Sequence, residues 1–270
     1  MIRSPLKWAG SKARIIDTLR QHLPAGNRLI EPFAGSGSVF FNTDYSSYLL
    51  ADINPDLIGL FIAMRNRTQE LIETAEIFFR RDNSEERFYT IRNNFNANDS
   101  AFARAVMFLY LNRHCYNGLC RYNLNGEFNA PYGKYKAPYF PENEIRQFAK
   151  KAKKAAFLCL DFEETIKMAG AGDVIYCDPP YAPTSSTANF TKYHTAGFTL
   201  DDHSRMIAAL QAAAARGCRV VVSNADVAAD LYQQAGFTVH HITAPRSVSC
   251  KGSERQVVGE IIATMGVANA

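Results

Sequence analysis

Four short apolar runs that alternate with helical segments constrain the fold of this chain most. They span residues 27–33, 48–54, 173–178 and 219–225. An alanine-rich segment at 203–217 has helical character, and two further runs, 237–244 and 256–265, are predicted strands. Strands that alternate with helices are typical of α/β proteins with a mainly parallel sheet and helices on both faces.

The predicted sheet also indicates where a ligand binds, because such sheets bind ligands at the carboxyl ends of their strands. The polar residues at those ends are Glu31, Asp52, Asp178 and Asn224. The glycine-rich stretch 34–40 follows the first strand and opens a helix, which favours a ligand at the helix N-terminus. Phe40 stands where the dinucleotide fingerprint requires a glycine, so a pyrophosphate is disfavoured. Asp52 suits ribose hydroxyls, and a nucleoside without phosphates, such as S-adenosylmethionine, satisfies both observations.

Residues 173–183, DVIYCDPPYAP, place an acid, two prolines and an aromatic ring directly after an apolar strand. Proline restricts its own φ and the conformation of the preceding residue, so the Pro-Pro pair fixes the direction of the Pro179 carbonyl. This carbonyl and the Asp178 carboxylate offer two acceptors to the N–H groups of an exocyclic amine, and Tyr181 offers a ring for stacking. The segment therefore predicts methyl transfer to adenine or cytosine. An ordinary proline turn after a strand is the alternative interpretation.

Between the second and third strands the alternation stops, and we predict an inserted module at 56–144. Residues 56–103 indicate helices and carry six basic against eight acidic residues. Residues 104–140 carry five basic residues against one acidic residue, together with nine aromatic residues and five asparagines. We expect this segment to be rich in loops and to contribute little core.

Composition excludes several other classes of protein. No apolar run approaches the length of a membrane span, and the first residues lack the apolar segment of a signal peptide, so we expect a cytoplasmic protein. The six cysteines are scattered without a Cys-x-x-Cys pair, so we expect neither a disulfide framework nor a metal site. Nothing indicates an obligate protein partner.

Together these motifs resemble the Dam family of DNA adenine-N6 methyltransferases, which act on GATC sites. The likeness covers nearly the whole chain and is carried by LKWAGSK (6–12), EPFAGSGSVFFNTD (31–44), LADIN (50–54), FLYLNRHCYNGLCRYN (108–123), GEFNAPYGKYKAPYFP (126–141) and DPPYAPTSSTANFTKYH (178–194). The resemblance implies a Rossmann-like α/β catalytic domain at 1–55 and 145–270, with a mainly helical target-recognition domain inserted at 56–144. It also implies S-adenosylmethionine as cofactor, double-stranded DNA as partner, and a bacterial or phage-encoded protein at the nucleoid.

The resemblance also assigns site residues by motif. The implied catalytic residues are Asp178, Pro179, Pro180 and Tyr181. The implied cofactor contacts are Trp8, Lys12, Glu31, Phe33, Gly35, Ser38, Asp52, Asp161, Phe162 and Asp178. The implied DNA contacts are Lys7, Arg113, Tyr116, Asn117, Leu119, Arg121, Pro131, Lys134 and Tyr135.

Four of these DNA contacts carry sequence recognition in the family. By motif match, Lys7 contacts the outer guanine of the site. Arg121 recognises a guanine in the major groove, where an arginine pairs with O6 and N7. Leu119 and Pro131 contact the thymine methyl group.

Three others act on the duplex itself. Tyr116 and Asn117 wedge into the stack as the target adenine flips out; without the family, Tyr116 would be interpreted as an ordinary turn residue. Lys134 departs from the family, which often has arginine there. Lysine keeps the charge but loses the bidentate fork, so we expect Lys134 to contact a phosphate.

Other functions remain open on the residues alone. A DNA cytosine-N4 methyltransferase would use the same amine chemistry. RNA and protein methyltransferases often carry asparagine in place of Asp178, and a dehydrogenase is opposed by Phe40. A catalytically inactive DNA-binding regulator is opposed by the intact motif at 178–181.

Overall fold

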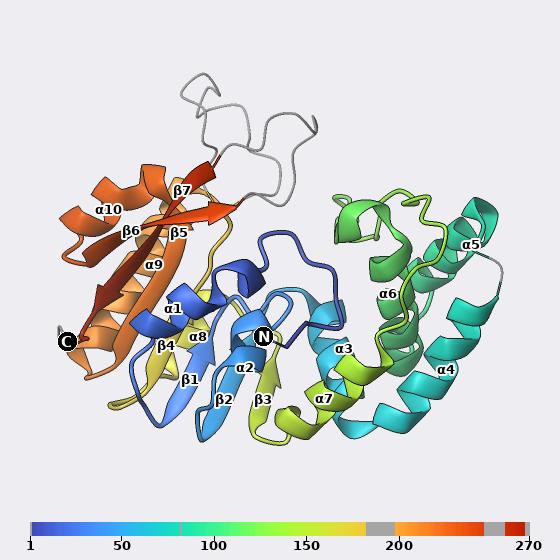
Figure 1. The fold of residues 1–270 in the computed structure, drawn as a ribbon, viewed down its shortest axis with the longest axis horizontal. Helices are drawn as coiled ribbons and strands as arrows, with labels where there is room; N and C mark the ends of the chain where they lie inside the picture. The colour runs from blue at the N-terminus through green and yellow to red at the C-terminus, as the bar shows by residue number, and fades with distance from the viewer. Residues whose placement is uncertain (1, 82, 182–197, 246–256, 268–270) are drawn as a thin grey trace. The chain divides into compact units, whose positions relative to one another are not determined.

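The computed structural model describes residues 2–81, 83–181, 198–245 and 257–267 and divides into two compact units (Figure 1). The helical unit comprises Met1–Ala13, Gly35–Asn42 and Asn54–Cys159. The sheet unit comprises Arg14–Ala34, Thr43–Ile53 and Leu160–Ala270.

Six strands form the sheet of the sheet unit. They are β1 (Arg28–Glu31), β2 (Ser47–Ala51), β4 (Val174–Cys177), β5 (Arg219–Ala225), β6 (Thr238–Pro245) and β7 (Val257–Met265). Their order is β2-β1-β4-β5-β7-β6. β1 pairs in parallel with β2 and β4, and β4 pairs in parallel with β5. β7 is antiparallel to both β5 and β6.

This arrangement confirms the predicted mainly parallel α/β fold. All four residues of β4 are buried, as expected for a parallel strand that is covered on both faces. The helices of this unit are α1 (Ile16–His22), α8 (Phe162–Lys167), α9 (Leu200–Ala215) and α10 (Ala229–Gln234), with a 3-10 turn, η3 (Asp226–Ala228). α9 packs against β5 and α8, α10 against β6 and β7, and α1 against β7. A capping box between Thr199 and Asp202 sets the start of α9.

The helical unit is built around one buried helix. Its helices are α2 (Ser38–Asn42), α3 (Pro55–Asn66), α4 (Thr68–Arg80), α5 (Glu85–Asn96), α6 (Ala101–His114) and α7 (Glu142–Ala152), and it also holds β3 (Ala155–Leu158) and two 3-10 turns, η1 (Lys12–Arg14, at its edge) and η2 (Tyr116–Gly118). α3, α4 and α5 all pack against α6. Every residue from Ala105 to Asn112 is buried, which marks α6 as a helix surrounded on all sides.

Two expectations from the sequence are corrected here. Residues 104–114 were expected to contribute little core, but they lie in α6 and form the centre of the helical unit. The expectation was wrong because it was based on the composition of the whole window 104–140. The polar residues at 115–140 outweighed the apolar residues of α6 in that composition. β3 was not predicted, because its four apolar residues form too short a run to separate from the preceding helix.

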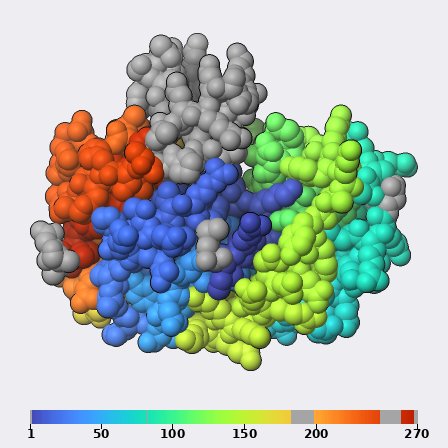
Figure 2. Space-filling model, viewed as in Figure 1, coloured from blue at the N-terminus to red at the C-terminus, as the bar shows by residue number. Residues whose placement is uncertain are grey.

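Residues 115–140 form loops that the helices support. Isolated bridges pair Cys115 with Tyr132 and Tyr122 with Phe128, which closes a short hairpin at 122–128. On the face drawn in Figure 2, the chain from this loop region to α7 forms a continuous part of the surface of the helical unit. The expected loop-rich character of this part of the insert is therefore confirmed.

The limits of the predicted functional module, 56–144, stay a prediction. In the structure the residues of this range pack with Met1–Ala13, Gly35–Asn42, α7 and β3 as one unit. Among the described residues, no helix combines the length and the apolar character that crossing a bilayer would require.

Candidate functional site

Three predicted acidic residues lie at neighbouring strand ends in the sheet unit. Glu31 ends β1, and its register partner on β2 is Leu50, two positions before Asp52. Asp178 directly follows β4, which pairs with the other edge of β1. Glu31 is buried, with 2% of its surface exposed, while Asp52 and Asp178 are half-buried. The carboxyl edge of this sheet therefore gathers three carboxylic side chains at the strand ends where the sequence placed them.

Asn224 lies at the carboxyl end of β5, as the sequence predicted, but its side chain is not available to a ligand. It is fully buried within β5, opposite Ile261 of β7. Its amide donates to the Tyr232 hydroxyl at 3.2 Å, and its carbonyl oxygen accepts from the Ala225 N–H at 2.8 Å. Both polar groups of Asn224 are thus used inside the sheet unit.

The proline motif begins where β4 leaves the core. The Asp178 carboxylate accepts a hydrogen bond from Ser223 Oγ at 3.1 Å. Pro179 is buried and Pro180 is exposed. The Tyr181 hydroxyl donates to Glu260 of β7 at 3.3 Å, and burial together with the nearby Asp178 carboxylate raises the pKa of this phenol well above its ordinary value. Residues 182–194 of the family motif lie outside the described residues.

An aromatic cluster lies beside α8. The ring of Phe33 stacks on that of Phe162 with centroids 5.5 Å apart, and Phe198 approaches both rings at 5.5 Å. Asp161 caps α8 by accepting the Glu163 N–H at 2.8 Å. The predicted residues Phe33, Asp161 and Phe162 are therefore neighbours, and the flat rings next to a carboxylate suit an adenine base.

Arg205 of α9 contacts both the acidic and the aromatic residues of this cluster. Its guanidinium contacts Asp161 at 3.3 Å, Glu163 at 2.9 Å and Asp202 at 2.9 Å, and lies 4.9 Å from the centre of the Phe162 ring. Arg205 was not predicted from the sequence, since nothing near it in the chain signals a role.

The other predicted cofactor residues, Trp8, Lys12, Gly35 and Ser38, belong to the helical unit. Gly35 has a φ of +47°, and a Cβ on it would lie 2.9 Å from the indole nitrogen of Trp8, so only glycine fits. Ser38 Oγ lies 2.6 Å from Ser11 Oγ, and the buried Lys12 ammonium donates to the Gly10 carbonyl at 3.0 Å. The assignment of these four residues to a cofactor stays a prediction.

Lys7 is held against α6 by its main chain. Its N–H donates to Asn112 Oδ1 at 2.9 Å, and its carbonyl accepts from Asn112 Nδ2 at 2.7 Å. Its ammonium donates to the Arg113 carbonyl at 3.2 Å and lies 3.6 Å from the centre of the Tyr135 ring. Burial, followed by the neighbouring Arg113 charge, lowers the pKa of Lys7. The structure thus brings together the predicted DNA residues Lys7, Arg113 and Tyr135.

Tyr116 and Asn117 project from the turn after α6. Tyr116 is 50% exposed, and Asn117 is exposed with a φ of 53°. The Asn117 N–H donates to the Tyr135 hydroxyl at 3.0 Å, and the Tyr116 N–H donates to the Pro131 carbonyl at 2.9 Å. A Cβ at Gly118 would lie 2.3 Å from Lys7 Cβ, so this turn requires a glycine. The main chain of the wedge predicted from the sequence is therefore fixed while its side chains remain accessible.

Arg121 is exposed and directly precedes the hairpin at 122–128. Its Nε donates to Asn129 Oδ1 at 2.7 Å and its Nη2 to the Asn129 carbonyl at 2.9 Å. Leu119 and Pro131 are half-buried, and Lys134 is exposed with a φ of 54°.

Two arginines of the basic window have partners within the helical unit. Arg104 pairs with the buried Asp56 at 2.7 Å, and the Tyr122 hydroxyl donates to the same carboxylate at 2.7 Å. Arg113 Nε donates to the Tyr139 carbonyl at 3.0 Å. The Arg104 charge is therefore balanced inside the unit, and the surface charge of this window is smaller than its composition suggests.

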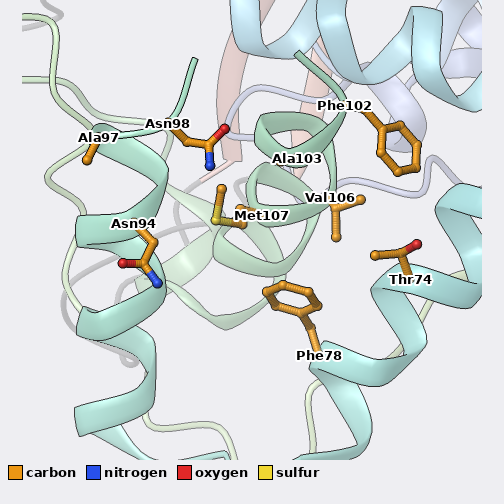
Figure 3. Close-up of a pocket in the computed structure, with 9 residues that line it drawn as sticks. All are labelled: Thr74, Phe78, Asn94, Ala97, Asn98, Phe102, Ala103, Val106 and Met107. Carbon is orange, nitrogen blue, oxygen red and sulfur yellow. The ribbon is translucent and has the colours of Figure 1, made fainter. Parts of the chain in front are cut away.

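A groove of about 480 Å³ lies between α4, α5 and α6 (Figure 3). The side chains that line it include Phe78, Phe102 and Met107, with Asn94 and Asn98 on one side. No residue predicted to contact cofactor or DNA lines this groove, so it is separate from the candidate site.

Comparison with known proteins adds a family to this geometry. Residues 8–248 match the model of the D12 class N6 adenine-specific DNA methyltransferases. A DNA adenine methylase of Serratia marcescens is 49% identical over 265 residues, which cover 97% of each chain. A DNA adenine methylase of Escherichia coli (strain K12) is 48% identical over 97% of this chain and 94% of that chain. Among solved structures, precorrin-6y C5,15-methyltransferase from Geobacter metallireducens GS-15 covers 93% of this chain and 86% of its own, at 10% identity and a TM-score of 0.39.

Proposed function

Because this chain belongs to the D12 class of N6 adenine-specific DNA methyltransferases, we propose that it uses S-adenosylmethionine to methylate adenine within GATC sites of double-stranded DNA. The observation that carries this proposal is the Asp178-Pro179-Pro180-Tyr181 segment directly after the buried strand β4. It supplies two acceptors and a ring at the carboxyl edge of the sheet, where α/β proteins bind ligands.

The proposed chemistry overcomes the weak nucleophilicity of the adenine amine, whose lone pair is delocalised into the ring. The Asp178 carboxylate accepts one N–H and the Pro179 carbonyl accepts the other, which directs the nitrogen lone pair towards the methyl group. Tyr181 stacks on the flipped base, and its hydroxyl bond to Glu260 holds the ring in place. When bound, the cofactor supplies an electrophilic methyl group on a positively charged sulfur.

The residues present fit this cofactor. Gly35 has no Cβ where one would meet Trp8, so the indole of Trp8 packs directly on the main chain of the glycine loop. The stacked Phe33 and Phe162 rings suit the adenine, and Asp52 suits the ribose hydroxyls. The proposed cofactor contacts are Trp8, Lys12, Glu31, Phe33, Gly35, Ser38, Asp52, Asp161, Phe162 and Asp178.

For DNA, we assign the exposed loops of 104–140 to recognition. Arg121 contacts a guanine in the major groove, and Lys7 contacts the outer guanine. Tyr116 and Asn117 occupy the space that the flipped adenine leaves, with Leu119 and Pro131 near the thymine methyl. Arg113, Lys134 and Tyr135 contact the backbone or flank the site.

In this proposal, residues 1–55 and 145–270 bind the cofactor and residues 56–144 recognise DNA. The protein, bacterial or phage-encoded, acts in the cytoplasm at the nucleoid.

A plasmid assay tests this function. Unmethylated plasmid is incubated with the protein and S-adenosylmethionine and then digested with nucleases that differ in their sensitivity to GATC methylation. The plasmid should become resistant to the nuclease that methylation blocks and sensitive to the one that requires it. Protein without cofactor serves as control. Unchanged digestion would contradict the GATC assignment, and methyladenine found in another sequence would replace that target.

A further inference from the structure

A buried chain of hydroxyl groups ends on the Asp178 carboxylate. Tyr176 Oη and Ser223 Oγ lie 2.8 Å apart, and Ser223 Oγ lies 3.1 Å from Asp178 Oδ1. Ser223 has no exposed surface and Tyr176 only 2%. Hydroxyls this deeply buried need protein partners, because leaving one unsatisfied costs about 1–3 kcal/mol.

The register of the sheet puts these three residues on one face. Tyr176 pairs with Val221 and Cys177 with Val222 in the parallel ladder between β4 and β5. Side chains alternate along a strand, so Tyr176 and Asp178 project to the same face, and so do Val221 and Ser223. Ser223 is therefore level with Asp178, and this position depends on the strand pairing rather than on a loop.

The number of hydroxyl protons decides which group donates in each of these two hydrogen bonds. Ser223 has one hydroxyl proton, and an ionised carboxylate can only accept, so Ser223 donates to Asp178. Ser223 must then accept from Tyr176, whose phenol stays protonated because burial and the Asp178 charge raise its pKa. Tyr176 thus orients the Ser223 hydroxyl, and Ser223 orients the carboxylate.

We propose that Ser223 is a positioning residue for methyl transfer and that Tyr176 supports it. This inference rests on the proposed function, in which Asp178 accepts an adenine N–H. A carboxylate held at Oδ1 keeps a narrow range of orientations, so the geometry for the amine exists before the base arrives. Ser223 itself touches neither base nor cofactor in this proposal. It acts through Asp178 and through the Tyr181 hydroxyl, with which it also interacts.

The test compares the rate of methyl transfer with the binding of both substrates. Ser223→Ala should lower the single-turnover rate by about 10- to 100-fold, the range expected for a hydrogen bond to a charged group. The affinities for S-adenosylmethionine and for a GATC duplex should change by less than about threefold, because the residue makes no binding contact. Tyr176→Phe should slow transfer by about 3- to 10-fold, since Ser223 keeps its own proton.

Two further variants separate positioning from loss of structure. Ser223→Thr keeps the hydroxyl and should restore most of the rate. Tyr45→Phe removes another buried hydroxyl of the sheet unit, one that donates to the Pro24 carbonyl at 2.7 Å before β2, and should leave the rate unchanged.

Each outcome decides a different question. A Ser223→Ala protein with the wild-type rate overturns the inference, and so does a folded Ser223→Thr protein as slow as the alanine variant. If the threonine variant does not fold, a wild-type rate in Tyr176→Phe overturns it. Asp178→Ala is run in parallel. If that variant stays active, the proposed role of Asp178 fails, whereas its inactivity beside an active Ser223→Ala variant refutes the positioning role alone.

Discussion

The two units hold their candidate functional side chains in different ways. In the sheet unit, Asp178 is fixed by side chains buried beneath it, Ser223 and then Tyr176. In the helical unit, Tyr116 and Asn117 are exposed, and the hydrogen bonds that hold them involve their main-chain N–H groups. The difference matches the two tasks. Methyl transfer requires one geometry, whereas recognition requires side chains that a duplex can reach, carried on a main chain that does not move.

The largest effect is expected in the sheet unit, on the rate of methyl transfer. Asp178→Ala should reduce methyl transfer by more than about 1000-fold, because the amine loses the charged acceptor of a preorganised site. Duplex binding should largely persist, because the proposed function assigns most phosphate contacts to residues 56–144. Radiolabelled methyl incorporation and a duplex gel-shift assay measure the two quantities. A comparable loss of both would mean that Asp178 maintains structure rather than chemistry.

Cofactor binding should respond next. Asp52→Ala should weaken S-adenosylmethionine binding by about 1–3 kcal/mol, the cost of leaving ribose hydroxyls unpaired in a closed site. Isothermal titration calorimetry measures this affinity. Asp44→Ala, an exposed acid before β2, is the matched control. Equal affinities in Asp52→Ala and the wild type would remove Asp52 from the ribose role.

Substitutions in the exposed loops of the helical unit should change the choice of DNA sequence more than the rate of methyl transfer. Arg121→Ala should lose about 1–3 kcal/mol of discrimination at one base pair, so that sites differing from GATC at that position become methylated. Lys134→Ala should instead weaken binding to every sequence and reduce the slope of the salt dependence by about one unit. A panel of single-base variants of GATC, assayed at two salt concentrations, separates the two. If Arg121→Ala slowed all sites equally, Arg121 would be a phosphate contact.

The smallest effect concerns the stability of the helical unit. Burial lowers the pKa of His114 to about 4, below its ordinary value of 6.5. Between pH 6.5 and pH 4 the histidine is therefore protonated in the unfolded chain but neutral in the folded protein. The free energy of unfolding falls as the pH drops through this range, by up to about 1.4 kcal/mol per pH unit. His114→Gln should show a shallower loss between pH 7 and pH 5 in urea unfolding. His241→Gln, at an exposed position, is the control, and identical slopes in His114→Gln and the wild type would contradict the assignment.

The sequence predicted the parts of this molecule that depend on local pattern. Asp52 and Asp178 each follow an apolar run, so the parallel strands β2 and β4 and the polar carboxyl edge were all expected. The loop from Tyr116 to Lys134 carried the asparagines and glycines that mark turns.

What the sequence could not predict depends on pairs of residues far apart in the chain. Arg104 counted as surface charge until the structure paired it with Asp56, 48 positions earlier. Ser223 resembles any residue of an apolar strand, and only the register of β5 on β4 brings it to Asp178. The buried stretch of α6 from Ala105 to Asn112 was missed because the loop that follows it in sequence is polar, although its neighbours in space are helices.

The anchoring of Lys7 to Asn112 has a consequence for how the protein is made. The two residues are 105 positions apart, and both main-chain polar groups of Lys7 bond to that one amide. On the ribosome, Lys7 emerges long before the helix that receives it has been synthesised. The main chain at Lys7 therefore cannot form these two hydrogen bonds until α6 has been synthesised, so that at this position assembly follows synthesis by more than a hundred residues.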